Sequence, residues 1–234
     1  MDKVIFIGDS WGRYLGEAAE TFGTLTPMNA EPEYKDTTII GSTASKFVRN
    51  YDSYMDRTTE ILRTDPHRLI IFSLGGNDFY NLGHFNDLTV ASSAFIEESF
   101  SKIRNNLISV LREIRTVSNA PILISGYDYF NITLLTDLFT PESCLRKLDT
   151  PFFNRLMTRL GRFFAEAAAA VPDARYTVNW GLLQNHADPN RYPLRGGNPD
   201  EPTPPEWIPD GMHPTPEGYR LLLESTLKQG GYRK

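Results

Sequence analysis

Short runs of apolar and β-branched residues that each end in glycine restrict the fold of this chain more than any other feature. Glycine directly follows the runs Val4 to Ile7, Thr37 to Ile40, Leu69 to Leu74 and Pro121 to Ser125. A shorter fifth run covers Tyr176 to Val178. Strands that are apolar on both faces are typical of a parallel sheet covered by helices on both sides. The pattern therefore predicts five parallel strands, with glycine turns at the carboxyl ends of the first four.

Helical patterns separate these runs. The clearest covers Ser92 to Val117, where apolar residues recur at helical spacing and form one stripe. The members of this stripe are Phe100, Ile103, Leu107, Leu111 and Ile114. Further helices are predicted over Ser45 to Arg63 and Phe152 to Val171, and a last one begins near Pro216 with Thr215 as N-cap. Strands that alternate with helices predict a three-layer α/β/α sandwich.

Composition and length predict a single globular domain over residues 1–234. Hydrophobic residues make up 40% of the chain and charged residues 23%, which is ordinary for a globular protein. The net charge of −5 does not indicate a nucleic-acid surface. No apolar run reaches the ~18 residues of a membrane span. The first apolar run is too short for the core of a signal peptide, so we expect a cytoplasmic location unless a leader has been removed.

Two long segments interrupt the alternation of strands and helices. Residues 127–150 are rich in aromatic residues and leucine, and residues 184–209 are rich in proline. Long loops in compact domains often serve function. Because residues 127–150 follow the fourth strand, they should emerge at the carboxyl edge of the sheet, where ligands bind in such folds. We therefore expect this segment to shape a substrate pocket.

A serine lies just past the first strand. Ser10 follows Gly8 and Asp9, at the point where a helix should begin. There its hydroxyl is presented at the edge of the sheet, and the helix N-terminus stabilises a negatively charged oxygen. Taken alone, the tripeptide is better explained by a serine that caps the helix.

An aspartate and a histidine stand three residues apart near the end of the chain. Asp210 and His213 lie on a turn that also contains Gly211 and Pro214. At this spacing the carboxylate can bond one imidazole nitrogen, and the other nitrogen can take a proton from a serine. Taken alone, the segment also fits a surface turn, because Asp-Gly is a common turn pair.

Two further residues could stabilise a developing negative charge. Asn77, in the run Gly75-Gly76-Asn77-Asp78, offers an amide donor at the end of the third strand. Gly41, at the end of the second, can present a backbone N–H with no side chain in the way. Taken singly, each fits a glycine-rich turn or a bend.

Together these residues resemble a known superfamily. Ser10, Gly41, Asn77 and His213 occur in the order and context typical of the SGNH hydrolases, esterases and lipases with a Gly-Asp-Ser motif near the N-terminus. The resemblance covers almost the whole chain. Trp11 departs from it, since many members carry leucine or isoleucine after the serine, and this departure bears on substrate preference.

The resemblance implies a flavodoxin-like α/β/α sandwich with five parallel strands. It implies that Ser10 is the nucleophile, that His213 is the general base and then the acid, and that Asp210 orients His213. It further implies that the oxyanion is held by the backbone N–H groups of Ser10 and Gly41 and by the side chain of Asn77. Neither a cofactor nor a metal is implied.

The activity expected from these residues is hydrolysis of carboxylic esters with short acyl chains, such as acetyl esters, through an acyl-enzyme. The substrate would be a small-molecule or carbohydrate ester. Bulky residues near the nucleophile are the candidate walls of its pocket. They are Trp11, Phe79, Tyr127, Tyr129 and Phe130. Each methylene accepted or refused by such a wall changes the binding free energy by only ~1–3 kcal/mol.

Other activities use the same residue types. Acyl transfer or O-deacetylation of carbohydrates would need the same site, because both proceed through the same acyl-enzyme. A metal-dependent phosphoesterase is less favoured, since the chain lacks a D-x-H opening and a G-N-H-[DE] block. The complete set of four residues argues against a non-catalytic binding module.

Overall fold

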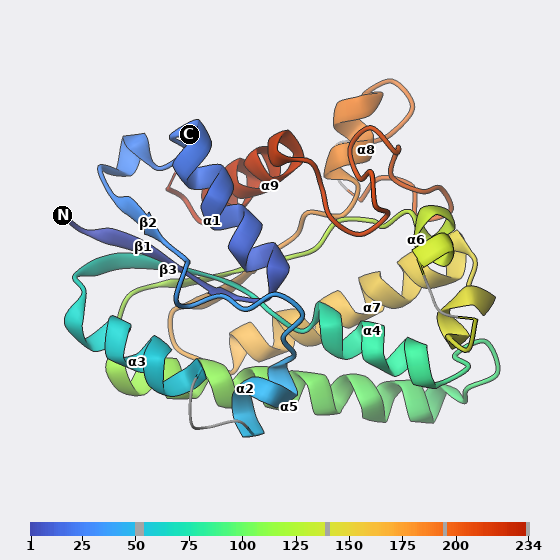
Figure 1. Cartoon of the computed structure of the whole chain (residues 1–234), viewed down its shortest axis with the longest axis horizontal. Coiled ribbons are helices and arrows are strands. Elements are labelled where there is room, and N and C mark those ends of the chain that lie inside the picture. Colours follow the sequence, from blue (N-terminus) through green and yellow to red (C-terminus); the bar gives the residue numbers. More distant parts are fainter. Residues whose placement is uncertain (50–53, 139–140, 194–195, 233–234) are drawn as a thin grey trace.

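The computed structural model describes residues 1–49, 54–138, 141–193 and 196–232. Its centre is a parallel sheet of five strands in the order β2-β1-β3-β4-β5 (Figure 1). The strands are β1 (Lys3–Gly8), β2 (Glu31–Glu33), β3 (His67–Ser73), β4 (Ile122–Ser125) and β5 (Ala174–Thr177). The five parallel strands and the α/β/α class are confirmed, although the second strand lies at another place in the sequence than predicted.

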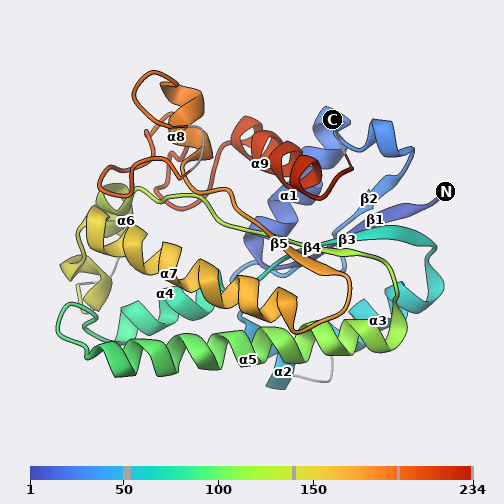
Figure 2. The ribbon, with the colours of Figure 1, turned by 180° about the vertical axis from the view of Figure 1, so that it is seen from behind.

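Helices cover both faces of the sheet. In chain order, the helices are α1 (Ser10–Phe22), α2 (Ala44–Arg49), α3 (Tyr54–Thr64), α4 (Gly76–Phe85), α5 (Ser93–Val117), α6 (Ile132–Leu138), α7 (Thr150–Ala169), α8 (Leu182–Ala187) and α9 (Pro216–Gln229). Two short 3₁₀ turns are η1 (Thr26–Met28) and η2 (Cys144–Lys147). Helices α1 and α9 lie together on one face, and α5 and α7 lie together on the other, as Figures 1 and 2 show from opposite sides.

The strands are apolar because both of their faces are buried. Residues Val4 to Ile7 of β1 and Leu69 to Phe72 of β3 have no exposed surface. The stripe predicted on the long helix also packs inward, since every member of it on α5 is buried. Among the described residues, no helix combines the length and the apolar composition needed to cross a membrane.

The predicted position of the second strand is wrong. The strand covers Glu31–Glu33, whereas Thr37 to Ile40 form no regular strand and meet the sheet through an isolated bridge between Thr38 and Gly8 and a hydrogen bond from the Thr37 hydroxyl to the Phe6 carbonyl oxygen. β2 is an edge strand of charged residues and proline, which edges tolerate and central strands do not. The rule used for central strands therefore missed it.

The predicted helix over 45–63 corresponds to two elements, α2 and α3, and residues 50–53 between them lie outside the described part. The long segments also contain regular structure: α6 and η2 lie within 127–150, and part of α8 lies within 184–209. The last helix begins as predicted, with the Thr215 hydroxyl accepting from the Gly218 N–H.

Candidate active site

The turn that follows β1 places Ser10 as the first residue of α1. At Gly8 a Cβ would lie 1.8 Å from the carbonyl oxygen of Ser73, so only glycine allows the turn to pass so close to β3. Asp9 caps α1, because its Oδ1 accepts from the Trp11 N–H at 3.0 Å. Ser10 therefore lies at a helix N-terminus beside the carboxyl end of the sheet, as the sequence predicted.

Ser10 meets the aspartate and histidine from the other end of the chain. Ser10 Oγ lies 3.0 Å from His213 Nε2, and His213 Nδ1 lies 2.7 Å from Asp210 Oδ2. The other oxygen, Asp210 Oδ1, accepts from the backbone N–H groups of Met212 and His213. Partial burial alone would raise the pKa of Asp210, but the hydrogen bonds from His213 and Met212 hold it below its ordinary value. The carboxylate thus stays charged and fixes the imidazole ring toward Ser10.

The turn that carries Asp210 and His213 rests on the start of α6. Gly211 adopts a φ of +79°, and a Cβ there would lie 2.5 Å from the carbonyl oxygen of Asn131. The Gly211 carbonyl oxygen accepts from the Asn131 N–H at 2.9 Å. On its other side His213 meets the ring of Tyr14 edge to face, at 5.4 Å between centroids. These contacts fix the position of the imidazole ring.

Asn77 comes from α4 and reaches the same place. The sequence placed Asn77 at the end of the third strand, with a glycine-rich turn as the alternative for the segment taken alone, and the structure puts it in the first turn of the helix that follows β3. Its Nδ2 donates to the carbonyl oxygen of Ser42 at 2.9 Å and lies 3.5 Å from Asp9 Oδ2. The amide therefore links α4 to the turn that carries Gly41 and to the residue beside Ser10.

The Gly41 turn is held at both ends, at one by the turn that carries Ser10 and at the other by Asn77 of α4. The Ile39 N–H donates to the carbonyl oxygen of Gly8 at 2.9 Å, and Ser42 is held by Asn77. Gly41 itself is exposed, has a φ of +73°, and a Cβ there would meet nothing within 4 Å. The residue is therefore open to solvent and carries no side chain of its own beside its backbone N–H.

Asp78 is a supporting residue to which the sequence gave no role. Its two carboxylate oxygens accept from the Ala44 and Ser45 N–H groups, at 2.6 and 3.2 Å. The carboxylate therefore caps α2 and holds the segment after Gly41 against α4. Burial raises the pKa of Asp78, although these backbone hydrogen bonds act in the opposite direction. Its place next to Asn77 was the only signal in the sequence.

A second unforeseen contact joins Asp9 to Tyr127. The Tyr127 hydroxyl donates to Asp9 Oδ2 at 2.9 Å and accepts from the Gly76 N–H at 2.9 Å. Burial raises the pKa of Asp9 to about 7, although the bonds from Tyr127 and Trp11 favour the charged form. Tyr127 thus connects the Ser10 turn to the start of α4.

A small cavity adjoins Ser10 and Asn77. Its free volume is about 10 Å³, roughly the space of one water molecule. Four of the five expected wall residues line it: Trp11, Phe79, Tyr127 and Phe130. Tyr129 lies elsewhere, with its ring stacked on Trp180 and its hydroxyl bonded to the Gly196 carbonyl oxygen. The lining side chains are almost fully buried and pack on one another, as in the edge-to-face contact of Trp11 with Tyr127 at 4.8 Å.

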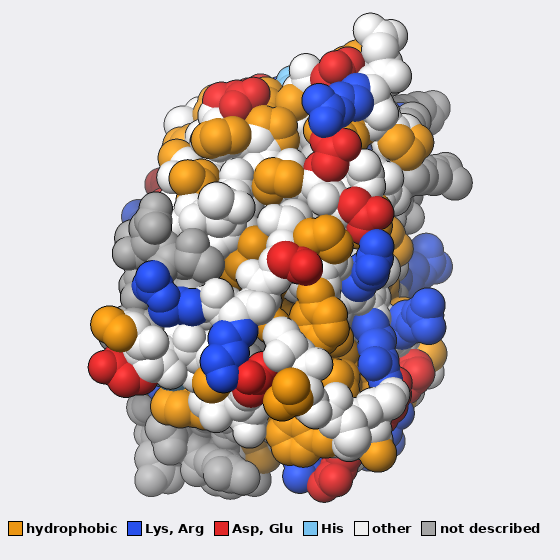
Figure 3. Space-filling model, turned by 90° about the vertical axis from the view of Figure 1, so that its right-hand side faces the viewer, with side chains coloured by type: hydrophobic (Ala, Val, Ile, Leu, Met, Phe, Trp, Pro, Cys, Tyr) orange, Lys and Arg blue, Asp and Glu red, His pale blue; other side chains and the backbone are white. Residues whose placement is uncertain are grey.

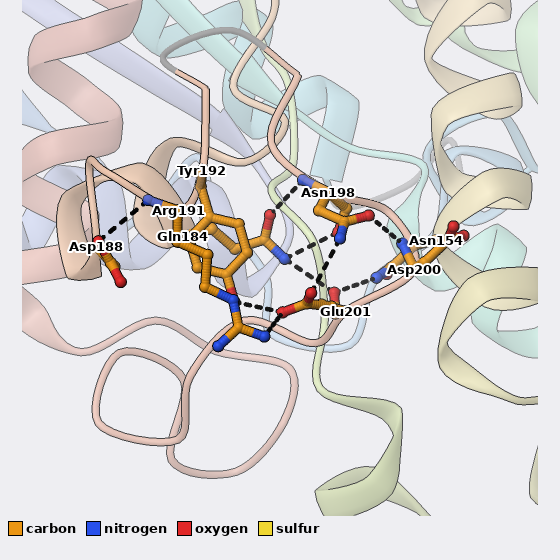
Figure 4. Close-up of polar contacts among 8 residues, drawn as sticks. All are labelled: Asn154, Gln184, Asp188, Arg191, Tyr192, Asn198, Asp200 and Glu201. Carbon is orange, nitrogen blue, oxygen red and sulfur yellow. Dashed lines mark hydrogen bonds and ion pairs between the residues drawn. The ribbon is translucent and has the colours of Figure 1, made fainter.

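The long segment before Asp210 is anchored by polar side chains (Figure 4). Gln184 donates to the carbonyl oxygens of Asn198 and Glu201, and its Oε1 accepts from the Asn198 N–H. Asn154 of α7 donates to the Glu201 carbonyl oxygen at 3.4 Å, and the Glu201 carboxylate accepts from Tyr192 at 2.6 Å. Gln184 and Asn154 have no exposed surface. The described part of this segment is therefore folded against α7 and α8.

Metal ligation is not indicated by the described side chains. Within residues 1–49, 54–138, 141–193 and 196–232, no three His, Cys, Asp or Glu residues are grouped so that they could hold an ion.

Three solved structures share the fold. BT4096, a gut microbial diltiazem-metabolizing enzyme, has a TM-score of 0.59 at 17% identity; the match covers 98% of this chain and 47% of that one, so this chain spans about half its length. Axe2, an acetylxylan esterase from Geobacillus stearothermophilus, has a TM-score of 0.56 at 16% identity, covering 100% and 96%. The lipase Lip_vut3 from a goat rumen metagenome has a TM-score of 0.58 at 15% identity, covering 100% and 99%. At these identities the likeness shows the fold alone.

Sequence comparison identifies the family. No curated protein is similar enough in sequence to be matched to the chain. The family model described as GDSL-like Lipase/Acylhydrolase matches residues 6–226, nearly the whole length. The chain therefore belongs to the GDSL-like lipase/acylhydrolase family of SGNH hydrolases and is a serine hydrolase that acts on ester bonds.

Proposed function

We propose that the protein hydrolyses short-chain carboxylic esters with Ser10 as nucleophile, His213 as base and Asp210 as the residue that orients the base. The observation that carries this proposal is the continuous path from Ser10 Oγ through the imidazole to the Asp210 carboxylate, with distances of 3.0 and 2.7 Å. A serine hydroxyl is a weak nucleophile until an adjacent base takes its proton, and this path supplies the base.

The reaction has two acyl-transfer steps. His213 Nε2 takes the Ser10 proton as Oγ attacks the ester carbonyl, and the resulting tetrahedral intermediate collapses when the imidazolium gives that proton to the departing alcohol. Water then attacks the acyl-serine with His213 again as base, and the acid leaves as the proton returns to Ser10. Asp210 holds the imidazole in one tautomer and stabilises its charged form throughout.

The negative oxygen of each intermediate is assigned to three donors. They are the backbone N–H groups of Ser10 and Gly41 and the side-chain amide of Asn77. Support comes from the hydrogen bonds that bring the Gly41 turn and Asn77 to the Ser10 turn. Donors fixed before the reaction stabilise the transition state without the cost of reorganisation.

The size of the cavity favours small acyl groups. Free space of about 10 Å³ beside Ser10, walled by buried aromatic rings, leaves little room for a chain of methylenes. We therefore assign acetyl and similarly short esters as the preferred substrates. The name of one structural neighbour, an acetylxylan esterase, agrees with this assignment.

Ser10→Ala tests the nucleophile. The substitution should reduce kcat for p-nitrophenyl acetate by ~10³-fold or more, because triad members act as a unit. Ser109→Ala, which alters a serine on α5 whose hydroxyl bonds the Asn105 carbonyl oxygen of the same helix, is the matched control and should retain full activity. A fluorophosphonate should label the wild-type chain once and the Ser10→Ala chain not at all. Retention of most hydrolysis by Ser10→Ala would refute the proposal.

Trp11→Ala tests the acyl pocket. Loss of this wall should shift the preference among p-nitrophenyl esters from acetate toward octanoate. Trp180→Ala removes another buried tryptophan that does not line the cavity, so it controls for general loosening of the core. A wild-type optimum at decanoate, or identical chain-length profiles for Trp11→Ala and wild type, would refute the short-chain assignment and leave the nucleophile untouched.

A further inference from the structure

The cavity beside Ser10 has a volume of only about 10 Å³, so most of an ester substrate must lie outside it. This reasoning rests on the proposed esterase function. The partly exposed residues that line the cavity are Gly76, Asn77 and Tyr80 of α4 and Met212 of the turn that carries His213. Helix α4 supplies three of these four residues, so it is a surface that a bound alcohol group would meet.

One face of α4 continues outward from Asn77. Residues three, four and seven positions on from it, Tyr80, Asn81 and His84, share its face of the helix. All four are partly or fully exposed, whereas Phe79 and Gly83 on the opposite side are buried. At 1.5 Å per residue the face is roughly 10 Å long from Asn77 to His84.

Aromatic rings follow this face to the end of the helix. The Tyr80 and His84 rings are nearly parallel, with 6.1 Å between centroids, and the Phe85 ring lies 4.6 Å from His84 and perpendicular to it. Phe85 is 75% exposed. The C-terminal end of α4 belongs to the end of the molecule seen in Figure 3, where hydrophobic side chains form a band across the surface. A large exposed ring beside His84, on the same end of α4, is a candidate contact for a ligand.

The face is rigid. A Cβ on Gly83 would lie 2.5 Å from Leu145 Cδ2, so α4 packs closely on η2. His84 Nδ1 lies 2.9 Å from the Ser143 hydroxyl, and Asp87 pairs with Lys147 at 2.6 Å. Groups that are already held in place lose little entropy when a ligand binds.

We propose that the α4 surface formed by Tyr80, Asn81, His84 and Phe85 binds the alcohol part of the substrate, and that this part is a neutral oligosaccharide. Sugar rings present apolar C–H faces that pack on aromatic rings, and hydroxyls that bond to phenol, amide and imidazole groups. The α4 surface offers both kinds of contact side by side, and none of its four residues is a lysine, arginine, aspartate or glutamate. A long acyl chain would use the rings but not Asn81 or His84.

Binding is tested without catalysis in Ser10→Ala. Xylohexaose, cellohexaose and chitohexaose, none of which carries an O-acetyl ester, are titrated into this variant by calorimetry. At least one should bind, and adding Phe85→Ala should weaken its affinity by about tenfold or more. Phe22→Ala, which removes another exposed phenylalanine ring, at the far end of α1, is the control and should leave the affinity unchanged. Asn81→Ala, an exposed substitution, gives a second readout if Phe85→Ala fails to fold.

Three results would overturn this inference. The first is that none of the three oligosaccharides binds, and the second is that Phe22→Ala weakens the affinity as much as Phe85→Ala does. The third is that Phe85→Ala weakens binding to decyl maltoside micelles but leaves the affinity for the oligosaccharides unchanged. Failure of the proposed esterase function appears separately, as p-nitrophenyl acetate hydrolysis that survives Ser10→Ala. With wild-type enzyme, Phe85→Ala should raise KM for an acetylated oligosaccharide more than it raises KM for p-nitrophenyl acetate.

Discussion

Removal of one hydroxyl, in Tyr127→Phe, should destabilise the protein in a way that depends on pH. The hydroxyl donates to Asp9 Oδ2 and accepts from the Gly76 N–H, both at 2.9 Å. Phenylalanine keeps the aromatic ring and its contact with Trp11, but it leaves Asp9 Oδ2 and the Gly76 N–H without their hydrogen-bond partner. The substitution therefore isolates the hydrogen bonds from the packing.

The sign of the pH effect follows from the pKa of Asp9. Burial raises this pKa to about 7 in the folded protein, from an ordinary value of 3.8. The folded state therefore binds a proton that the unfolded state has lost, and the free energy of unfolding falls as pH rises from about 4 to about 7. Because the Tyr127 bond favours the charged form, its removal raises the pKa of Asp9 further. In the variant the fall in stability should therefore continue above pH 7.

The magnitude follows from the two states of the acceptor. Hydrogen bonds between neutral groups contribute about 0.5–1.5 kcal/mol, and those to a charged group about 1.5–3 kcal/mol. At pH 5.5, where Asp9 is protonated, we expect Tyr127→Phe to cost about 2 kcal/mol, which includes the unsatisfied Gly76 N–H. At pH 8.5 the cost should rise by about 1 kcal/mol more, because the lost bond is then one to a carboxylate.

Urea unfolding at pH 5.5 and 8.5, followed by tryptophan fluorescence, measures both values. Tyr129→Phe is the matched control, since that buried hydroxyl donates to the carbonyl oxygen of Gly196. Its cost should be the same at both pH values. An equal cost of Tyr127→Phe at both pH values would refute the conclusion that Asp9 titrates near neutrality against this hydroxyl.

Three further predictions concern the candidate site. Asn77→Ala should lower kcat by ~10²–10³-fold with little change in KM, measured with p-nitrophenyl acetate, because an oxyanion donor acts in the transition state; a raised KM at constant kcat would contradict this role. In thermal unfolding, Gly41→Ala should lower the free energy of unfolding by about 1–2 kcal/mol, because of the positive φ alone. Gly8→Ala should prevent stable folding, because its Cβ would overlap the Ser73 carbonyl. Similar melting temperatures for the two variants would refute this difference. Activity should survive dialysis against EDTA, since protein groups fill every proposed role, and loss on chelation with recovery on Mn²⁺ would favour a metal-dependent reaction.

The central strands could be predicted because a strand that is buried on both faces consists of a continuous run of apolar residues. β1, β3 and β4 are continuous apolar runs, and their hydrogen-bonded neighbours lie on either side. β2 could not be found in this way, because an edge strand has one open side and Glu31, Pro32 and Glu33 carry no apolar signal. The run around Thr38 instead passes the end of β1, which it meets through a single bridge to Gly8, and Ile40 within it is 65% exposed.

The sequence indicated which residue types belong together but not what supports them. Ser10 and His213 could be paired from chemistry and from their positions at the sheet edge and in the last turn. The contact of Asp78 with the start of α2 crosses 33 residues or more, and that of Tyr127 with Asp9 crosses 118. Contacts across so many residues leave no pattern of local spacing in the sequence. Tyr127 was therefore expected only as a wall of the pocket, and its hydrogen bond to Asp9 was not foreseen.

Asp9 explains how three separate strand ends form one site. One carboxyl oxygen caps the helix after β1, and the other accepts from Tyr127, which follows β4, and lies 3.5 Å from the amide of Asn77, which follows β3. Burying a carboxyl group is unfavourable, as its raised pKa shows, and only a group with several fixed donors around it can remain there. A side chain with a single acceptor oxygen at this position could not both cap α1 and accept from the elements that follow β3 and β4. The position of Ser10 relative to Asn77 therefore depends on a buried acid that takes no part in the proposed chemistry.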